Sequence, residues 1–339
     1  MSVTIRDVAK EAGVSTSTVS KVLNNWSSIS PETTARVQAA IQKLRYTPNA
    51  RAVSFAKGAT NHILFLTRLA KEQAYANPHM FEILSGTQKV LAQHGYSLIL
   101  TDFPEDASYR DYFSGLIESR IADGILIHGS CQFPQMTGLL MESQFPHIYI
   151  GHPGPGSRLG WIDTNNGLDG QIAAGHMLEC GYSKVAFLGE SRTDHISMQR
   201  LNGFLGGMYD YGYRIPDCYI RHTDSSRDDA YAQTCELLSL PEPPEAVIFA
   251  NNNLALGGVR ALREARLRIP EEIAFLTFDS YPYSAIISPA PTVIDIDVYD
   301  LGVQAGLMLL RKIKNPSLLV QSYTTLPVLR QGTSTRVSR

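Results

Sequence analysis

The chain has 339 residues, of which 44% are hydrophobic and 18% charged, with 30 Lys and Arg against 32 Asp and Glu. This length predicts two or three domains, and the composition excludes global disorder. The cysteines form no CxxC pair, which argues against a thiolate zinc site or a redox motif. Arg6 and Asp7 precede any apolar run, and no stretch approaches the roughly 18 apolar residues of a membrane helix. We therefore expect a cytosolic protein without a membrane partner.

The charge is divided unevenly along the chain. Residues 1–58 contain eight Lys and Arg and three Asp and Glu, a net charge of +5. The remaining residues contain 22 basic and 29 acidic side chains, a net charge of −7. A basic segment on an acidic body indicates a nucleic-acid-binding module joined to a domain that binds something small.

The basic segment carries the patterns of three short helices. Apolar residues at i, i+3, i+4 and i+7 predict an amphipathic helix over residues 5–12, with Thr4 as its cap and Gly13 at its end. Ser15 is the candidate cap of a second helix, and the dipeptide Ser30-Pro31 begins a third. The segment is therefore expected to be a small helical domain.

The first two of these helices are joined by the minimal turn 12–14, which is typical of a helix-turn-helix. The outward face of the second helix has short or flexible polar side chains, so it can lie in a DNA major groove. Those side chains belong to Thr16, Ser17, Thr18, Ser20, Lys21 and Asn24. The same pattern also fits an ordinary three-helix domain with a solvated polar face.

The residues of this domain also carry a family resemblance. The segments TIRDVAKEAGVS, beginning at Thr4, and TVSKVLN, beginning at Thr18, resemble the headpiece of LacI-type (lactose-repressor family) bacterial transcription regulators. The resemblance implies a DNA-binding headpiece over residues 1–48 and a double-stranded operator as partner. It implies that bases are read by Thr16, Ser17 and Lys21, with Thr18 beside them, and that the backbone is contacted by Thr4 and Asn24. A lysine can donate to guanine O6 and N7, which agrees with this assignment.

Residues 49–60 resemble the hinge of the same family. The resemblance implies a short helix that folds on the operator, includes Arg51 among its DNA contacts and wedges an apolar side chain into the minor groove. This chain has Phe55 where the family usually has leucine, and a phenylalanine can still unstack a base step. Alternatively, Phe55 packs against the body of the protein.

Beyond Thr60, short β-rich runs alternate with helical stretches. Nearly continuous apolar strands separated by helices predict parallel sheets covered on both faces. The expected strands are residues 62–67, 97–102, 124–128 and 147–151, then 184–189, 246–251, 272–279 and 292–297, with a late run at 322–330. The predicted fold class is α/β: a helix-turn-helix headpiece followed by two Rossmann-like lobes with a cleft between them.

The family resemblance extends through this region and implies a core of the periplasmic-binding-protein type. It is carried by segments such as 77–83, 122–125, 200–204 and 250–257. The first lobe is expected to comprise residues 61–162 and 292–321. The second lobe is expected to comprise residues 163–291 and 322–339.

Five residues are candidates for contacting an effector in the cleft. Arg200, Asn251 and Asp279 match positions where the family contacts its effector, and His79 and Met80 stand where relatives place aromatic contacts. A guanidinium, an amide and a carboxylate suit a polyhydroxylated, sugar-like ligand. Alternatively, Arg200 and Asp279 form a structural ion pair, and Asn251 serves turn chemistry.

The sequence contains no HExxH, GxSxG or P-loop motif, so we expect neither an enzyme nor a cofactor. The predicted function is that of a homodimeric repressor, cytoplasmic and nucleoid-associated, whose DNA affinity is controlled by a sugar-like effector. One alternative is a cytosolic sugar-binding protein without sequence-specific DNA binding. Another is a nucleotide-sugar enzyme built on a Rossmann-like body.

Overall fold

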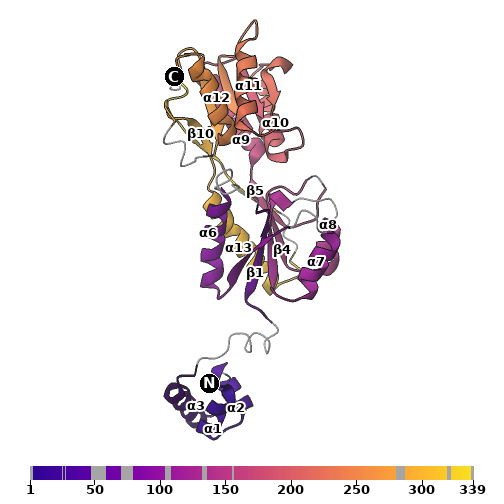
Figure 1. Ribbon diagram of the computed structural model, residues 1–339, viewed down its shortest axis with the longest axis vertical. Coiled ribbons are helices and arrows are strands. Elements are labelled where there is room, and N and C mark those ends of the chain that lie inside the picture. Colours follow the sequence, from indigo (N-terminus) through magenta and orange to yellow (C-terminus); the bar gives the residue numbers. More distant parts are fainter. Residues whose placement is uncertain are drawn as a thin grey trace. The chain divides into compact units, whose positions relative to one another are not determined.

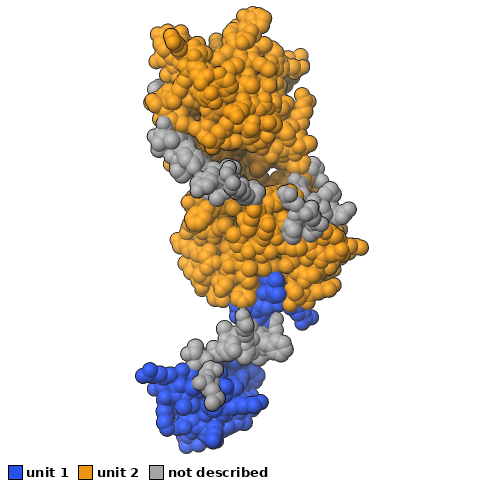
Figure 2. All heavy atoms as spheres, in the orientation of Figure 1, with its two compact units in different colours: residues 1–61, 120–122 blue, residues 62–119, 123–339 orange. Residues whose placement is uncertain are grey.

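The computed structural model describes residues 3–24, 26, 28–46, 59–69, 79–103, 108–131, 136–154, 156–279, 287–318 and 322–336. The chain divides into two compact units (Figure 2). The first comprises residues 1–61 with 120–122, and the second comprises residues 62–119 with 123–339. Within the described residues, no helix is both long enough and apolar enough to cross a membrane.

The first unit contains the three predicted helices, α1 (Ile5–Ala12), α2 (Thr16–Leu23) and α3 (Pro31–Leu44). Gly13 ends α1 in the left-handed conformation (φ 66°) that favours glycine. Ser15 accepts a hydrogen bond from the Thr18 amide, and Ser30 accepts one from the Thr33 amide, so both predicted caps are confirmed. The small core comprises Val8, Ala9, Ala12, Val19, Val22, Val37 and Ala40.

The second unit begins with a six-stranded parallel sheet in the order β11-β5-β4-β3-β1-β2. Its strands are β1 (His62–Thr67), β2 (Ser97–Asp102), β3 (Gly124–His128), β4 (His147–Ile150), β5 (Trp161–Thr164) and β11 (Ser322–Thr325). Figure 1 shows α6 (His79–Gln93) and α13 (Val298–Lys314) on one side of this sheet and α7 (Tyr109–Glu118) and α8 (Met136–Ser143) on the other. The short helix η1 (Gly129–Cys131) follows β3. These elements form the first lobe.

The second lobe has a six-stranded sheet in the order β12-β10-β9-β8-β6-β7. Its strands are β6 (Val185–Gly189), β7 (Ile220–His222), β8 (Ala246–Phe249), β9 (Ala274–Phe278), β10 (Thr292–Asp295) and β12 (Val328–Arg330), of which β12 alone runs antiparallel to its neighbour. Its helices are α9 (Asn166–Glu179), α10 (His195–Asp210), η2 (Asp217–Tyr219), α11 (Arg227–Leu238) and α12 (Asn252–Glu264). The expected α/β fold with two sheets is confirmed.

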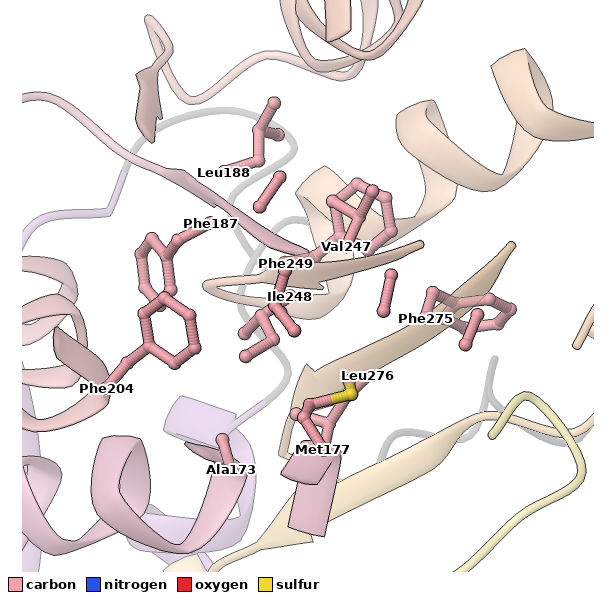
Figure 3. Packing of buried hydrophobic residues seen from close by; sticks show 14 of the residues in the cluster. Ala173, Met177, Phe187, Leu188, Phe204, Val247, Ile248, Phe249, Phe275 and Leu276 are labelled. Atoms are coloured by element: carbon pink, nitrogen blue, oxygen red, sulfur yellow. The ribbon is translucent and has the colours of Figure 1, made fainter. Parts of the chain in front are cut away.

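The core of the second lobe fixes the position of α10. Phe204 on α10 stacks on Phe187 of β6 with ring centroids 5.8 Å apart (Figure 3). Helix α10 also lies so close to α9 that a Cβ added to Gly203 would be 2.0 Å from the Gly167 carbonyl oxygen. Only glycine allows this backbone contact, which holds α10 against the lobe and therefore positions Arg200.

The predicted division of the lobes was wrong for two strands. β10 was expected in the first lobe but lies beside β9 in the second sheet. β11 was expected in the second lobe but pairs with β5 in the first sheet. The predicted run 322–330 is two strands separated at Pro327, because proline cannot donate a ladder hydrogen bond. The chain therefore passes between the lobes after β5, after β10 and after β11.

Candidate functional site

The polar face of α2 is accessible in the first unit. Thr16, Ser17, Lys21 and Asn24 are exposed, and Thr18 is half-buried. The Ser15 hydroxyl lies 2.7 Å from that of Ser17 and 2.9 Å from that of Thr18, so the capping network orients both hydroxyls. The helix therefore presents a fixed polar surface at its N-terminal end, as a base-reading helix requires.

Two of the predicted DNA contacts have local structural roles. The amide and hydroxyl of Thr4 donate to the Asp7 carboxylate at 2.8 and 2.7 Å, which fixes the start of α1. The Asn24 side-chain amide donates to the Ser20 carbonyl oxygen at 2.8 Å at the end of α2. Both residues remain predicted backbone contacts. Arg51 and Phe55 lie outside the described residues, so their roles in the hinge also stay predictions.

Lys21 has an aromatic neighbour that the sequence analysis did not single out. Its ammonium nitrogen lies 5.8 Å from the ring centroid of Trp26, within the range of a cation–π contact. Trp26 is 59% exposed, although tryptophan usually buries most of its surface. The contact limits the positions available to the Lys21 side chain on the α2 surface.

A cavity of about 550 Å³ lies in the second unit and is lined by residues of both lobes. Residues of the first lobe that line it include His79, His128, Ser130, Tyr149 and His152. Residues of the second lobe include Glu190, Asp194, His195, Arg200, Arg227, Asn251, Asn252 and Asp279. Asp163 and Asn166, where the chain first passes between the lobes, also line the cavity. The predicted cleft is therefore present.

Arg200 and Asp279 are brought together as an ion pair. The Arg200 guanidinium donates to both Asp279 carboxylate oxygens, at 3.3 and 3.0 Å. It also donates to Asp169 at 3.2 Å and to the Ala250 carbonyl oxygen at 2.8 Å. Burial raises the pKa of Asp169 to about 6, although the nearby guanidinium opposes this shift. The ion-pair alternative is thus realised at a position that also faces the cavity.

The backbone of Asp279 has an unusual conformation that directs its carboxylate. Its φ is 70°, in the left-handed region that few residues other than glycine adopt. The amide of Asp279 donates to the Ile294 carbonyl oxygen at 2.8 Å, and its own carbonyl oxygen accepts from the Asn252 side chain at 2.6 Å. These bonds hold the residue in a conformation that occurs preferentially at functional sites.

Asn251 combines the two roles that the sequence left open. Its side-chain oxygen accepts from the Leu254 amide at 3.0 Å and caps α12, which is the expected turn chemistry. Its side-chain nitrogen donates to Glu190 at 2.5 Å. The residue lines the cavity with its polar atoms already engaged, so it orders Glu190 there.

His79 and Met80 separate in the structure. The imidazole of His79 lies 4.0 Å from the Asp279 carboxylate, which links the two lobes. The sulfur of Met80 accepts a hydrogen bond from the Thr67 hydroxyl at 3.3 Å, and this buried side chain is not among the residues that line the cavity. Successive helical residues point about 100° apart, so His79 and Met80 cannot both face the cleft.

His128, His152 and Glu190 also line the cavity, although none of them was predicted from the sequence. All three are at or just after strands that end at the cleft, namely β3, β4 and β6. Ligands of α/β proteins bind at the carboxyl ends of parallel strands, so strand position was the available signal. Trp161 does not line the cavity; its ring packs edge-on against His152 with centroids 4.8 Å apart.

Comparisons with known proteins agree with the helix-turn-helix domain of the first unit and with the two-lobed core of the second. Residues 4–49 match the lacI family of bacterial regulatory proteins. Residues 174–335 match the periplasmic binding protein-like domain. The ribose operon repressor of Escherichia coli (strain K12) is 29% identical over 337 residues, covering 97% of this chain and 98% of that protein. The HTH-type transcriptional repressor PurR of Haemophilus influenzae (strain PittEE) is 29% identical over 326 residues, covering 96% and 95%.

Solved structures show the same fold. The lac repressor dimer bound to operator and the anti-inducer ONPF superposes with a TM-score of 0.82 at 22% identity, covering 99% of this chain and 100% of that chain. The complex of the transcriptional regulator CelR with cellobiose superposes with a TM-score of 0.74 at 23% identity, covering 98% and 99%.

A helix-turn-helix domain and a two-lobed core around a polar cavity define a class: DNA-binding transcription regulators that respond to a small ligand. Within that class, the chain has the organisation of LacI-family regulators, because residues 4–49 match the lacI-family headpiece and residues 174–335 match the periplasmic-binding-like core.

Proposed function

We propose that this chain represses transcription by binding a pseudo-palindromic operator as a homodimer, with its DNA affinity controlled by a small carbohydrate in the cleft. The cavity of about 550 Å³ between the lobes carries this proposal, because a ligand held by both lobes stabilises one lobe arrangement over another. A regulator that acts on the bacterial chromosome works in the cytoplasm, on the nucleoid.

The chemistry of the cavity supports a carbohydrate. Carboxylates, amides and imidazoles are among the groups that line it, and sugar hydroxyls can both donate to and accept from such groups. The CelR structure contains cellobiose in a protein of the same fold. The buried carboxylates Asp169 and Asp279 are engaged by Arg200, which favours ligand binding over acid–base catalysis.

Selection of duplexes from a randomised pool by the full chain should enrich a pseudo-palindrome. Binding to the selected duplex, measured by fluorescence anisotropy, should then change at least about tenfold with a sugar that also raises the melting temperature. The panel should include ribose, glucose, galactose, lactose and cellobiose. Enrichment of no sequence, with sugar binding intact, would favour the alternative of a sugar-binding protein without specific DNA recognition.

The homodimer is supported by an exposed apolar surface on the first lobe. It is formed by Phe81 and Leu84 of α6 and by Leu98 and Leu100 of the edge strand β2, whose side chains share the face of the sheet next to α6. Phe81 is 71% exposed and Leu100 is 45% exposed. An apolar edge strand favours association, and a symmetric dimer buries such a surface against its own copy.

Leu100→Lys is expected to convert the dimer largely to monomer at micromolar concentration, because it places a charge in the buried part of this surface. Sedimentation velocity measures the change directly. Tyr211→Lys is the matched control, since Tyr211 is 67% exposed on the second lobe and away from the apolar surface. A Leu100→Lys protein that sediments like the wild type would place the dimer contact elsewhere.

A further inference from the structure

The charges that line the cavity are unequal. Of the residues that the structure describes, four carboxylates line it, those of Asp163, Glu190, Asp194 and Asp279, and two arginines do so. Of these, Arg200 is already neutralised by Asp169 and Asp279. The other, Arg227, is exposed and donates to the Asn253 side-chain oxygen at 2.7 Å. Among the described residues, Asp163, Glu190 and Asp194 therefore line the cavity without a Lys or Arg at ion-pair distance.

Glu190 is the clearest of these carboxylates. It is half-buried at the end of β6, and its contacts at hydrogen-bond distance are neutral, with Asn251 donating at 2.5 Å. Burial raises the pKa of Glu190, and the nearby Asp194 carboxylate adds to this effect. No Lys or Arg among the described residues forms an ion pair with Glu190. A cation brought by a ligand would complete this environment.

Asp163, on the segment between the lobes, is a second cavity-lining carboxylate whose hydrogen-bond donors are neutral. It is buried and accepts from the Thr164 amide at 2.8 Å and from the Asn166 side chain at 3.1 Å. Burial raises the pKa of Asp163 to about 7. An added anion would increase the repulsion in a cavity that already contains these carboxylates.

The first-lobe wall presents neutral donors instead. Nδ1 of His128 accepts from the Ser130 amide at 3.2 Å, and Nδ1 of His152 accepts from the Gly154 amide at 3.1 Å. The proton of each neutral ring is therefore on Nε2, which is left as a donor. Burial lowers the pKa of His128 to about 4, so its ring is uncharged near neutral pH. Such donors suit hydroxyl and ring oxygens and do not neutralise a phosphate.

We propose that the effector is an aminated carbohydrate, whose protonated amine lies against Glu190 and whose oxygen atoms face His128 and His152. The inference rests on the proposed function and adds a positive charge to the ligand. The cavity would then bind amino sugars more tightly than the parent sugars that have a hydroxyl in place of the amine, and it would bind sugar phosphates poorly. An ammonium group replaces one hydroxyl and donates three hydrogen bonds, which matches a site rich in acceptors.

Isothermal titration of the full-length protein near neutral pH tests this preference. The probes are glucose with glucosamine and galactose with galactosamine, together with N-acetylglucosamine and glucose phosphate. At least one amine is expected to bind about tenfold or more tightly than its parent sugar, because it gains a charge-assisted contact. N-acetylglucosamine should lose that gain, and glucose phosphate should bind most weakly.

Glu190→Gln locates the amine. Glutamine keeps the size of the side chain and an oxygen that accepts from Asn251, but it removes the charge. The ratio of amine to parent affinity should fall towards one. Glu236→Gln on α11, where the carboxylate is 61% exposed, should leave the ratio as in the wild type.

The outcomes separate the inference from the function on which it rests. Parent sugars that bind as tightly as their amines, or a phosphate that binds best, overturn the inference and leave the carbohydrate effector standing. A preference for amines that survives Glu190→Gln overturns the placement of the amine. Binding of no sugar in the panel overturns the carbohydrate effector and the inference together, while operator selection still tests DNA binding on its own.

Discussion

Arg200→Met should destabilise the protein by about 3–5 kcal/mol, the usual cost of removing one partner from a buried charge network. Arg200 is 3% exposed, and it neutralises Asp169 and Asp279, which are 0% and 8% exposed. Without the guanidinium both carboxylates stay in a low-dielectric environment, and the Ala250 carbonyl oxygen loses its donor. Urea unfolding followed by circular dichroism measures the loss.

Two further variants make the Arg200 result specific. Arg200→Lys keeps the charge but cannot donate to both Asp279 oxygens and Asp169 at once, so it should recover only part of the stability. Arg268→Met breaks an exposed pair with Glu272, in which the arginine is 72% exposed, and should cost less than about 1 kcal/mol. A similar small loss for Arg200→Met would mean that the cluster contributes little to the fold.

Lys21→Ala is expected to reduce discrimination between the selected operator and random duplex by about 5- to 150-fold, equivalent to about 1–3 kcal/mol for one base contact. Lys21 is exposed on the polar face of α2, and Trp26 restrains its ammonium group at 5.8 Å. The ratio of the two dissociation constants, measured at one salt concentration, isolates base reading from phosphate attraction.

Lys43→Ala is the matched control for Lys21→Ala. Lys43 carries the same charge in the same domain, but it pairs with Glu11 at 2.6 Å and lies on α3. Its removal should weaken binding to both duplexes alike and leave their ratio within about twofold of the wild type, as expected for non-specific electrostatics. Equal ratios for Lys21→Ala and the wild type would exclude Lys21 from reading bases.

The parts of the fold that follow local rules were predictable from the sequence. Gly13, Ser15 and Ser30 delimit helices through their own backbone geometry and hydrogen bonds, so their roles could be inferred from neighbouring residues. The sheet to which a strand belongs depends on distant partners. The strand pattern of residues 292–295 would look the same in either lobe, and this is why the predicted lobe boundaries failed there.

The contacts of the candidate site also depend on distant partners and could not be predicted from neighbouring residues. Arg200, Asn251 and Asp279 were predicted from resemblance, but their contacts join distant segments: Arg200 pairs with Asp279, 79 residues away, and Asn251 donates to Glu190, 61 residues away. The role of Glu190 depends on its surroundings in the fold, where the described residues place the neutral Asn251 side chain at 2.5 Å and no Lys or Arg in an ion pair with it, and no short motif encodes this. The tautomers of His128 and His152 depend on backbone amides two residues further along the chain, in loops whose path only the fold defines.

The late strands have a consequence for synthesis of the protein. β11 and β12 are the edge strands of different sheets, and both come from residues 322–330. During translation, β5 and β10 therefore lack their last neighbouring strands until this short stretch has left the ribosome. The nascent chain therefore completes both lobes almost simultaneously, and a ribosome that stalls before this point holds two open edges available for wrong pairing.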